Sequence, residues 1–574
     1  MSLLRFRLSR VLVVLVPLAI TSSLYLYLYP VFRGCAFPLP INKNERPHDS
    51  FNPAYSPLFH TLSQHIGQQP ASEPAVFRLL VLADPQLEGD SSLPSPNEEL
   101  PARIKQHWSA IRSSVTESGS PIHRDVLGSV TAALRTLANE DVPRSVRAAR
   151  KRLDLLGNDF YLAHIYRTLH WWTRPTHVAV LGDLIGSQWV TDEEFERRGD
   201  RYWNRVFRGG QRVSDEVTVT GSAGYGAASG DVSGLEELDA TDSAWSRRVI
   251  NIAGNHDIGY AGDASEARIE RFERMFGRAN WDVCFQYTRE NQTGDAADAA
   301  VKPTLHLINL NTLTLDGPAL SEQVQSSSYA FINDLITHRT YPVEDRTTFT
   351  LLLTHLPLHK KDGVCTDGPL FTYHESDDED GPDGMPRFKA GGLREQNHLS
   401  EQLSATGVLQ GIYGMSGDKD VPGEGWGRNG LILNGHDHTG CDVVHFVNRS
   451  ITTDKGDGTS QQTWKWDARR YSRVPEDRSD TPSIREVTLR AMMGDYGGNA
   501  GLLSVWFDAN PAVNEWKYEI TMCMAGVQHI WWAIHVIDIV TVLLLLVYTL
   551  LPRSIGLKSQ AAKSVSAKGP QHKS

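Results

Sequence analysis

Five short motifs, each placed directly after a run of apolar residues, most constrain how this chain folds. They are Asp84-Pro85-Gln86, Gly182-Asp183, Gly254-Asn255-His256-Asp257, Thr354-His355 and Gly435-His436-Asp437-His438. Short apolar runs of this kind are typical of buried strands. Loops that leave neighbouring strands converge at one edge of a sheet. The pattern therefore predicts a pocket lined by Asp, Asn and His side chains, which are ligands for divalent metal ions.

Helical and strand patterns alternate along the rest of the chain, which favours an α/β architecture. We expect residues 100–175 to be mostly helical, and Glu486–Leu489 and Leu502–Asp508 to be the strands that close the sheet system. The stretches 208–245 and 450–482 are polar and are predicted to be surface insertions.

Two apolar runs bracket this body, and each approaches the roughly 20 residues that span a bilayer. Their basic flanks face the chain termini, so the positive-inside rule predicts cytosolic termini and a lumenal body. A cleaved signal peptide is the alternative for the first run. The predicted organisation is cytosolic residues 1–10, a transmembrane helix at 11–32, a lumenal linker at 33–75, a lumenal globular domain with insertions at 76–525, a transmembrane helix at 530–551 and a basic cytosolic tail at 552–574.

The formal net charge of −11 is unevenly distributed. Residues 1–10 carry three arginines and residues 552–574 carry five basic side chains, with no acid in either stretch, so residues 11–551 carry −19. An acidic body argues against a nucleic-acid partner and suits a protein that recruits divalent cations. Asp538 lies inside the second apolar run, where an acid has either a functional role or a place near the interface.

The cysteine and glycosylation patterns fit the lumen of the secretory pathway. The five cysteines have no CxxC spacing, which excludes a zinc ribbon, and one or two disulfides are expected without an assignment of pairs. Asn291 and Asn448 begin N-glycosylation triplets, so we predict a glycoprotein.

The residue types at the strand ends predict two metal positions. Asp84 and Asp183 supply carboxylates, one of which can bridge two ions, and Asn255 supplies an amide oxygen. Imidazole nitrogens come from His355, His436 and His438. Two ions held in this way clamp the attacking and leaving oxygens of a phosphoryl displacement, which predicts a phosphoester hydrolase.

His256 is the predicted catalytic acid, because it follows a ligand and is not needed to hold metal. It is expected to contact the phosphate or to protonate the leaving oxygen, and Asp257 is expected to orient its ring. Tyr161 and Arg167, in a helical stretch rich in aromatic residues, are candidates for substrate binding. Packing of that helix on the sheet is the alternative for both.

The motif set over roughly residues 76–510 resembles the calcineurin-like metallophosphoesterase superfamily, whose pattern is DxH, GDxxD, GNH(D/E), H and GHxH. The resemblance implies a metallophosphoesterase β-sandwich flanked by helices, here with two flanking transmembrane helices. It implies a first metal held by Asp84, Gln86, Asp183 and His438. It implies a second metal held by Asp183, Asn255, His355 and His436.

Two positions depart from the superfamily pattern. Gln86 replaces the histidine of DxH, and Gly186 replaces the last aspartate of GDxxD. An amide oxygen is a harder ligand than imidazole, so Mn²⁺ is the expected metal, with Mg²⁺, Fe²⁺ or Zn²⁺ as alternatives. A loosely bound first metal, or a Gln86 that does not ligate, is also open.

These departures, together with Asn158–Leu162, His164–Arg167 and Leu181–Trp189, resemble the fungal GPI-anchor phosphoesterase branch, similar to the mammalian post-GPI-attachment phosphoesterase. The resemblance implies removal of ethanolamine phosphate from a mannose of GPI-anchored proteins. This trimming supports their export from the endoplasmic reticulum through p24-type cargo receptors, in the membrane of that compartment or of the Golgi. The alternatives are a phosphoesterase for another lumenal or lipid-linked phosphate, and a catalytically weak adaptor that binds GPI glycans or cargo receptors.

Overall fold

The computed structural model describes residues 3–38, 61–62, 65–66, 76–89, 93–118, 124–219, 235–238, 244–287, 302–338, 342–377, 386–453, 460–472 and 481–551. The chain divides into two units, which are described separately. One consists of Met1–Leu28 with His529–Ser574, and the other of Tyr29–Gln528.

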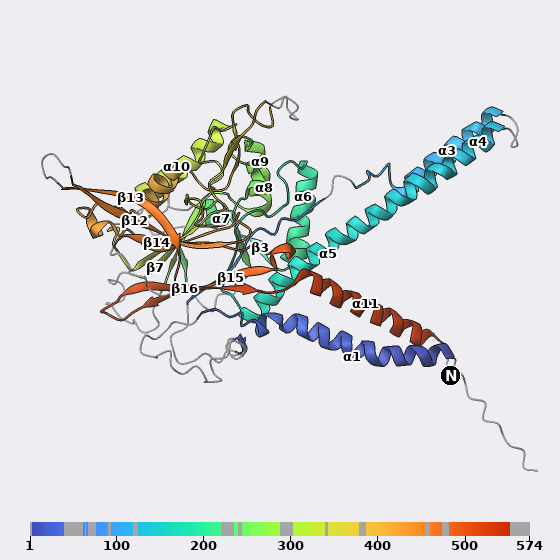
Figure 1. The fold of residues 1–574 in the computed structure, drawn as a ribbon, viewed down its shortest axis with the longest axis horizontal. Coiled ribbons are helices and arrows are strands. Elements are labelled where there is room, and N and C mark those ends of the chain that lie inside the picture. Colours follow the sequence, from blue (N-terminus) through green and yellow to red (C-terminus); the bar gives the residue numbers. More distant parts are fainter. Residues whose placement is uncertain are drawn as a thin grey trace, which may run out of the picture. The chain divides into compact units, whose positions relative to one another are not determined.

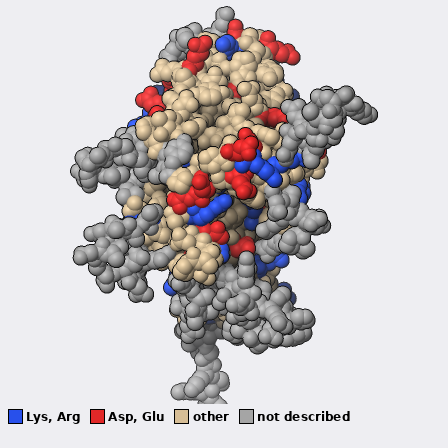
Figure 2. Space-filling view, turned by 90° about the vertical axis from the view of Figure 1, so that its left-hand side faces the viewer, with Lys and Arg blue, Asp and Glu red and all other residues tan. Residues whose placement is uncertain are grey.

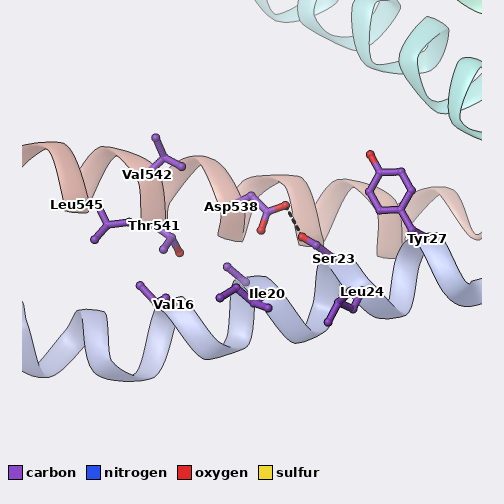
Figure 3. Close-up of a pocket in the computed structure, with 10 residues that line it drawn as sticks. Val16, Ile20, Ser23, Leu24, Tyr27, Asp538, Thr541, Val542 and Leu545 are labelled. Atoms are coloured by element: carbon purple, nitrogen blue, oxygen red, sulfur yellow. Dashed lines mark hydrogen bonds between the residues drawn. The ribbon is translucent and has the colours of Figure 1, made fainter.

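The first unit contains the two apolar helices, α1 (Leu3–Phe32) and α11 (Gln528–Leu550). Both are long and apolar enough to cross a membrane, as the sequence predicts. Asp538 faces α1, and its carboxylate accepts a hydrogen bond of 2.9 Å from the Ser23 hydroxyl (Figure 3). Near the other end of the pair, the Arg5 guanidinium donates to the carbonyl oxygen of Leu551.

The second unit is built on two large sheets and one small sheet. The first large sheet has, in spatial order, β16 (Glu515–Met524), β15 (Asn499–Asp508), β1 (Phe77–Leu82), β2 (His177–Val180), β5 (Arg248–Asn251) and β3 (Gln211–Arg212). Strands β1, β2 and β5 are mutually parallel, with Leu79 opposite His177 and Val178 opposite Val249. Their carboxyl ends therefore share one edge of the sheet.

The second large sheet has eight strands. In spatial order these are β13 (Ser460–Arg470), β12 (Cys441–Thr453), β14 (Ser483–Thr488), β11 (Asn429–Asn434), β8 (Thr348–Leu353), β7 (Thr304–Asn309), β6 (Trp281–Gln286) and β4 (Leu235–Glu237). Strands β7, β8, β11 and β14 run parallel. The small sheet pairs β9 (Phe371–Tyr373) with β10 (Leu393–Gln396).

Side chains from both large sheets form one continuous apolar core. Members from the six-stranded sheet include Leu79, Val81 and Ile250, and those from the eight-stranded sheet include Leu351 and Leu433. All five are fully buried. This arrangement confirms the predicted α/β fold, a β-sandwich flanked by helices.

Helices lie outside the sandwich, and α3, α4 and the first part of α5 extend away from the sheets (Figure 1). The helices of this unit are α3 (Leu100–Ser118), α4 (Arg124–Thr136), α5 (Val142–Thr173), α6 (Asp192–Arg201), α7 (Asp215–Val219), α8 (Asn255–Ile258), α9 (Glu266–Phe276) and α10 (Glu322–His338). Short helical turns are η2 (Leu137–Asp141), η3 (Tyr202–Val206), η5 (Leu403–Ile412), η6 (Pro422–Gly425) and η7 (Gly494–Tyr496).

Part of the predicted insertion 450–482 is regular structure. Residues 450–453 end β12 and residues 460–470 form β13, and the two strands pair as a long antiparallel hairpin with Val447 opposite Trp466. Trp464 and Trp466 alternate with polar residues on β13 as in a half-exposed strand. Strand β16 is not among the strands predicted from the sequence, and it pairs with β15 along its whole length.

Two disulfides lie in the second unit. Cys35, just after α1, bonds to Cys523 on β16, and Cys365 bonds to Cys441 at the start of β12. The fifth cysteine, Cys284, is buried on β6 and belongs to neither disulfide. The expected number of one or two disulfides is met, and both pairs fit an oxidising compartment.

Candidate metal centre

The predicted ligands lie just beyond the carboxyl ends of five parallel strands. Strands β1, β2 and β5 lead into Asp84, Asp183 and Asn255, and strands β8 and β11 lead into His355 and His436. Both sheets therefore contribute to one site at the same end of the sandwich.

The backbone at this site is held in a rarely populated conformation. Asp84, Gln86, Asp183 and His436 have positive φ angles of 51°, 41°, 52° and 72°. Each such residue costs about 1–3 kcal/mol and persists only where its surroundings enforce the conformation, and such residues cluster at functional sites. All four of these strained residues are predicted metal ligands.

Two glycines let the ligand loops approach each other closely. A Cβ on Gly254 would lie 2.0 Å from the backbone nitrogen of Asp183. Gly182 has a φ of +91°, and a Cβ there would lie 2.2 Å from Nδ1 of His355. The glycines before Asp183 and Asn255 are therefore required by the packing of the ligands.

The first half of the centre consists of Asp84, Asp183, His438 and Gln86. One ligand atom from each of Asp84, Asp183 and His438 lies within 4.8 Å of the others. The Gln86 amide nitrogen lies 3.0 Å from Oδ2 of Asp183 and 3.1 Å from Nε2 of His438. Gln86 therefore occupies the place of the DxH histidine, and rotation of its amide group would present the oxygen instead.

The second half consists of Asp183, Asn255, His355 and His436. Oδ1 of Asn255 lies 2.9 Å from Nε2 of His355 and 3.0 Å from Nδ1 of His436. Oδ1 of Asp183 lies 3.4 Å from Nε2 of His355. Asp183 thus directs one oxygen to each half.

The residues present fit two divalent cations. Oδ2 of Asp84 is buried and has no hydrogen-bond partner among the described residues, which suits a metal ligand. Nδ1 of His355 donates to the carbonyl oxygen of Leu181 at 2.8 Å, so the lone pair of its Nε2 faces the centre. The donor set of carboxylate, amide oxygen and imidazole suits hard or borderline divalent ions.

Comparisons with known proteins agree with this geometry. The chain is 32% identical over 419 residues to protein TED1 of Saccharomyces cerevisiae, a match that covers 68% of this chain and 77% of that protein. This chain therefore belongs to the metallophosphoesterase family. Metallophosphoesterase 1 of Cricetulus griseus is 21% identical over 303 residues, covering 51% and 57% of the two chains.

The matches place this metallophosphoesterase in a fungal branch related to the mammalian metallophosphoesterase 1. An uncharacterized protein of Schizosaccharomyces pombe is 25% identical over 419 residues, covering 69% of this chain and 82% of that protein. No family model matches the chain. Members of the family are metal-dependent phosphoesterases, which agrees with the candidate site formed by Asp84, Asp183 and His438.

The two carboxylates of this metallophosphoesterase centre differ in their electrostatics. Burial raises the pKa of Asp84 well above its ordinary value, and the neighbouring Asp183 raises it further. Burial also acts to raise the pKa of Asp183, but His355 and His256 outweigh it, and that pKa is lowered. Desolvation and the nearby His355 lower the pKa of His436 to about 3, so its ring is neutral and able to bind metal.

His256 lies beside the centre and is accessible. Its side chain is 37% exposed, and Nε2 lies 3.8 Å from Oδ2 of Asp183. Its backbone N–H donates to Oδ1 of Asp183 at 2.9 Å, which fixes the start of α8 next to the bridging carboxylate. This placement suits a group that meets the substrate.

The predicted role of Asp257 as the group that orients the His256 ring is wrong in this structure. The Asp257 carboxylate is fully buried and accepts from the backbone N–H groups of Gly254, Leu184 and Ile185 at 2.8–3.1 Å. It points inward from the first turn of α8. Asp257 therefore holds the loops of Asp183 and Asn255 together.

The two predicted substrate-binding residues are engaged elsewhere. Tyr161 is fully buried on α5, and its hydroxyl is 3.3 Å from the carbonyl oxygen of Gly526. Arg167 donates to the carbonyl oxygen of Arg205 at 2.7 Å. Tyr161 therefore packs inside the protein, as the alternative describes, whereas Arg167 is exposed and its role in substrate binding stays a prediction.

Of the two glycosylation candidates, only Asn448 lies in the described part of the chain. It is half-buried on β12 and donates to Asp467 on β13 at 3.3 Å. Asn291 lies outside the described residues.

Two contacts of the ligand histidines were not predicted. The Tyr496 hydroxyl lies 3.3 Å from Nδ1 of His438, and Nε2 of His436 lies 3.0 Å from the carbonyl oxygen of Gln396. Tyr496 belongs to the loop Met492–Asn499, whose glycines are the sequence signal for a tight turn. For Gln396, a backbone carbonyl leaves no signal in the sequence.

Proposed function

We propose that this chain is a dinuclear-metal phosphodiesterase of the secretory-pathway lumen. In this proposal it removes ethanolamine phosphate from a mannose of GPI anchors and supports export of GPI-anchored proteins from the endoplasmic reticulum. The observation that carries the proposal is the convergence of both ligand sets on Asp183, with the exposed His256 beside them. The substrate rests on the resemblance to the fungal GPI-anchor branch.

The residues around the centre have distinct roles in the proposed reaction. Two divalent ions, with Mn²⁺ proposed, supply electrostatic stabilisation of the attacking and leaving oxygens when bound. Asp183 contributes one oxygen to each half of the centre. Asp257 holds the loop that carries Asp183 beside the loop that carries Asn255. His256 donates a proton to the mannose oxygen as the bond between that oxygen and phosphorus breaks.

The proposed location is the endoplasmic reticulum membrane, with the Golgi as alternative. Support comes from the two apolar helices, the basic termini outside them and the two disulfides. The proposed topology has both termini in the cytosol and residues 76–525 in the lumen. Cargo receptors of the p24 type remain a proposed partner that rests on the resemblance alone.

A nucleic-acid partner is not proposed. On the face drawn in Figure 2, basic and acidic side chains are interspersed and form no continuous basic area. The net charge of −11 points the same way, since phosphate backbones bind to concentrations of Lys and Arg.

An assay of the full-length protein in detergent tests the proposed function. With added Mn²⁺, the protein is expected to release ethanolamine phosphate from a GPI glycan. His256→Ala is expected to lower kcat about 10²–10⁴-fold while bound metal is unchanged. Hydrolysis of a generic phosphodiester without release from the glycan would favour another substrate, and neither bound metal nor hydrolysis would favour the adaptor.

A further inference from the structure

A second buried polar cluster lies behind the metal centre, around the carboxylate of Glu486 on β14. Glu486 is fully buried, and each of its oxygens accepts two hydrogen bonds. Oε1 accepts from the backbone N–H of Leu358 at 2.7 Å and from the Asn434 amide at 2.6 Å. Oε2 accepts from Lys360 at 2.7 Å and from His445 at 2.7 Å.

The donors come from the segments that carry metal ligands. Leu358 and Lys360 follow His355 on the chain leaving β8, and Asn434 is the last residue of β11, just before His436. His445 lies on β12, the strand that begins after His438. One carboxylate therefore connects the loop of His355 with the loops of His436 and His438.

The charge state of Glu486 suits a group that connects these loops by accepting hydrogen bonds. Burial acts to raise the pKa of Glu486, but Lys360 and His445 outweigh it, so the pKa is lowered and the group is a carboxylate at neutral pH. An ionised carboxylate only accepts hydrogen bonds, and so all four donors keep their orientation. A protonated acid or an amide in the same place presents at least one donor to its neighbours.

We propose that Glu486 is a positioning residue that sets the spacing of His355 and His436 and thereby the affinity of the second half of the centre for metal. The inference rests on the metal centre of the proposed function, and it is independent of the GPI substrate. The partners behind a metal ligand contribute to affinity because they fix the orientation of that ligand before the ion binds. Glu486 does this through the backbone N–H of Leu358 on the chain that follows His355 and through the side-chain amide of Asn434 just before His436.

The variant Glu486→Gln tests the proposal in the full-length protein. Whichever way the amide turns, two of the four donors face an NH₂ group, so the loops lose their common anchor. We expect Mn²⁺ titration followed by EPR to show affinity at the second half lower by about 10–100-fold, with the first half still occupied. The milder His445→Leu removes one donor only and is expected to shift affinity in the same direction by less.

Asp282→Asn is the matched control. Asp282 on β6 and His306 on β7 form another buried carboxylate–imidazole pair, at 2.7 Å, in the same eight-stranded sheet. Neither strand end supplies a predicted ligand. This variant is expected to lower thermal stability while both metal affinities stay within about twofold of wild type, a change well below the 10-fold expected when a ligand's support is lost.

The outcomes separate this inference from the proposed function. A wild-type protein that binds no metal would contradict the metal centre itself. Wild-type affinity at both halves in Glu486→Gln or, if that variant does not fold, in His445→Leu would contradict the positioning role alone. An equal loss of metal in Asp282→Asn would also contradict it, since the effect would then follow from stability.

Discussion

The two halves of the metal centre are supported to different degrees. In the second half His355 is fully buried, its Nδ1 is fixed by Leu181, and the loops of His355 and His436 meet at Glu486. In the first half Gln86 is half-buried, and Nδ1 of His438 lies 3.3 Å from the Tyr496 hydroxyl. Because fixed ligands lose less freedom when an ion binds, we expect the second half to bind metal more tightly. The first half is also where the sequence departs from the family pattern.

Asp183→Asn is expected to have the largest effect, since it breaks both halves together. The substitution keeps the shape of the side chain and replaces one of the two oxygens that face the metal positions. We expect loss of both ions and a fall in phosphodiesterase activity on the order of 10³-fold. Metal analysis of the purified variant checks this, and retention of two ions per chain would contradict a bridging role.

Asp84→Asn is expected to weaken the first half alone and to stabilise the metal-free protein. The pKa of Asp84 is raised in the folded state, so ionisation at neutral pH opposes folding. This cost begins as pH rises through the ordinary value of 3.8 and is complete above the folded pKa. The amide carries no such cost, and each kcal/mol regained raises Tm by about 2–4 °C.

Glu486→Gln is expected to lower the Tm of the metal-free protein, the opposite of the change expected for Asp84→Asn. The pKa of Glu486 is lowered, so its stabilising contribution is present above its ordinary value of 4.5 and is lost as pH falls through the folded pKa. Thermal denaturation at pH 7 in EDTA checks both variants. A lower Tm for Asp84→Asn would contradict the assignment of Asp84 as a residue kept for metal binding at a cost in stability.

Gln86→His is expected to have the smallest effect and to bring the metal affinities of the two halves closer together. Restoring imidazole at this position should raise affinity at the first half by several-fold, roughly 1 kcal/mol, and shift preference from Mn²⁺ towards Zn²⁺. Tyr496→Phe is the matched comparison, because it leaves the ligands unchanged and removes only the hydroxyl near His438. Competition titration with the two metals distinguishes them, and unchanged affinity in Gln86→His would indicate that position 86 does not ligate.

The sequence predicts the ligands well because each one follows a strand formed by its own apolar run. Asp84, Asp183 and His355 need only local patterns. Parallel pairing brings Asp84 and Asp183 to one edge of the six-stranded sheet and His355 beside His436 at an edge of the eight-stranded sheet. The residues that surround the ligands are brought there by contacts between segments that lie far apart in the sequence. Glu486 reaches Leu358 over 128 residues of sequence, and no local pattern records that contact.

Contacts between segments far apart in the sequence also account for the features that local patterns did not predict. Asp257 was assigned to His256 because the two are adjacent in sequence, but the first turn of α8 directs its carboxylate to the backbone of Leu184 and Ile185. The partners of Cys35 and Cys365 depend on the assembled sheets, with separations of 488 and 76 residues. The strands within residues 450–482 have a polar composition because their hairpin has one exposed face.

Titration of the full-length protein with Mn²⁺, followed by EPR and metal analysis, tests the central claim most directly. A centre bridged by Asp183 predicts two ions per chain, about 3.5–4 Å apart, whose EPR signals are coupled. The second half should fill before the first. Binding of one ion or none, or of two ions without coupling, would contradict a dinuclear centre at these strand ends.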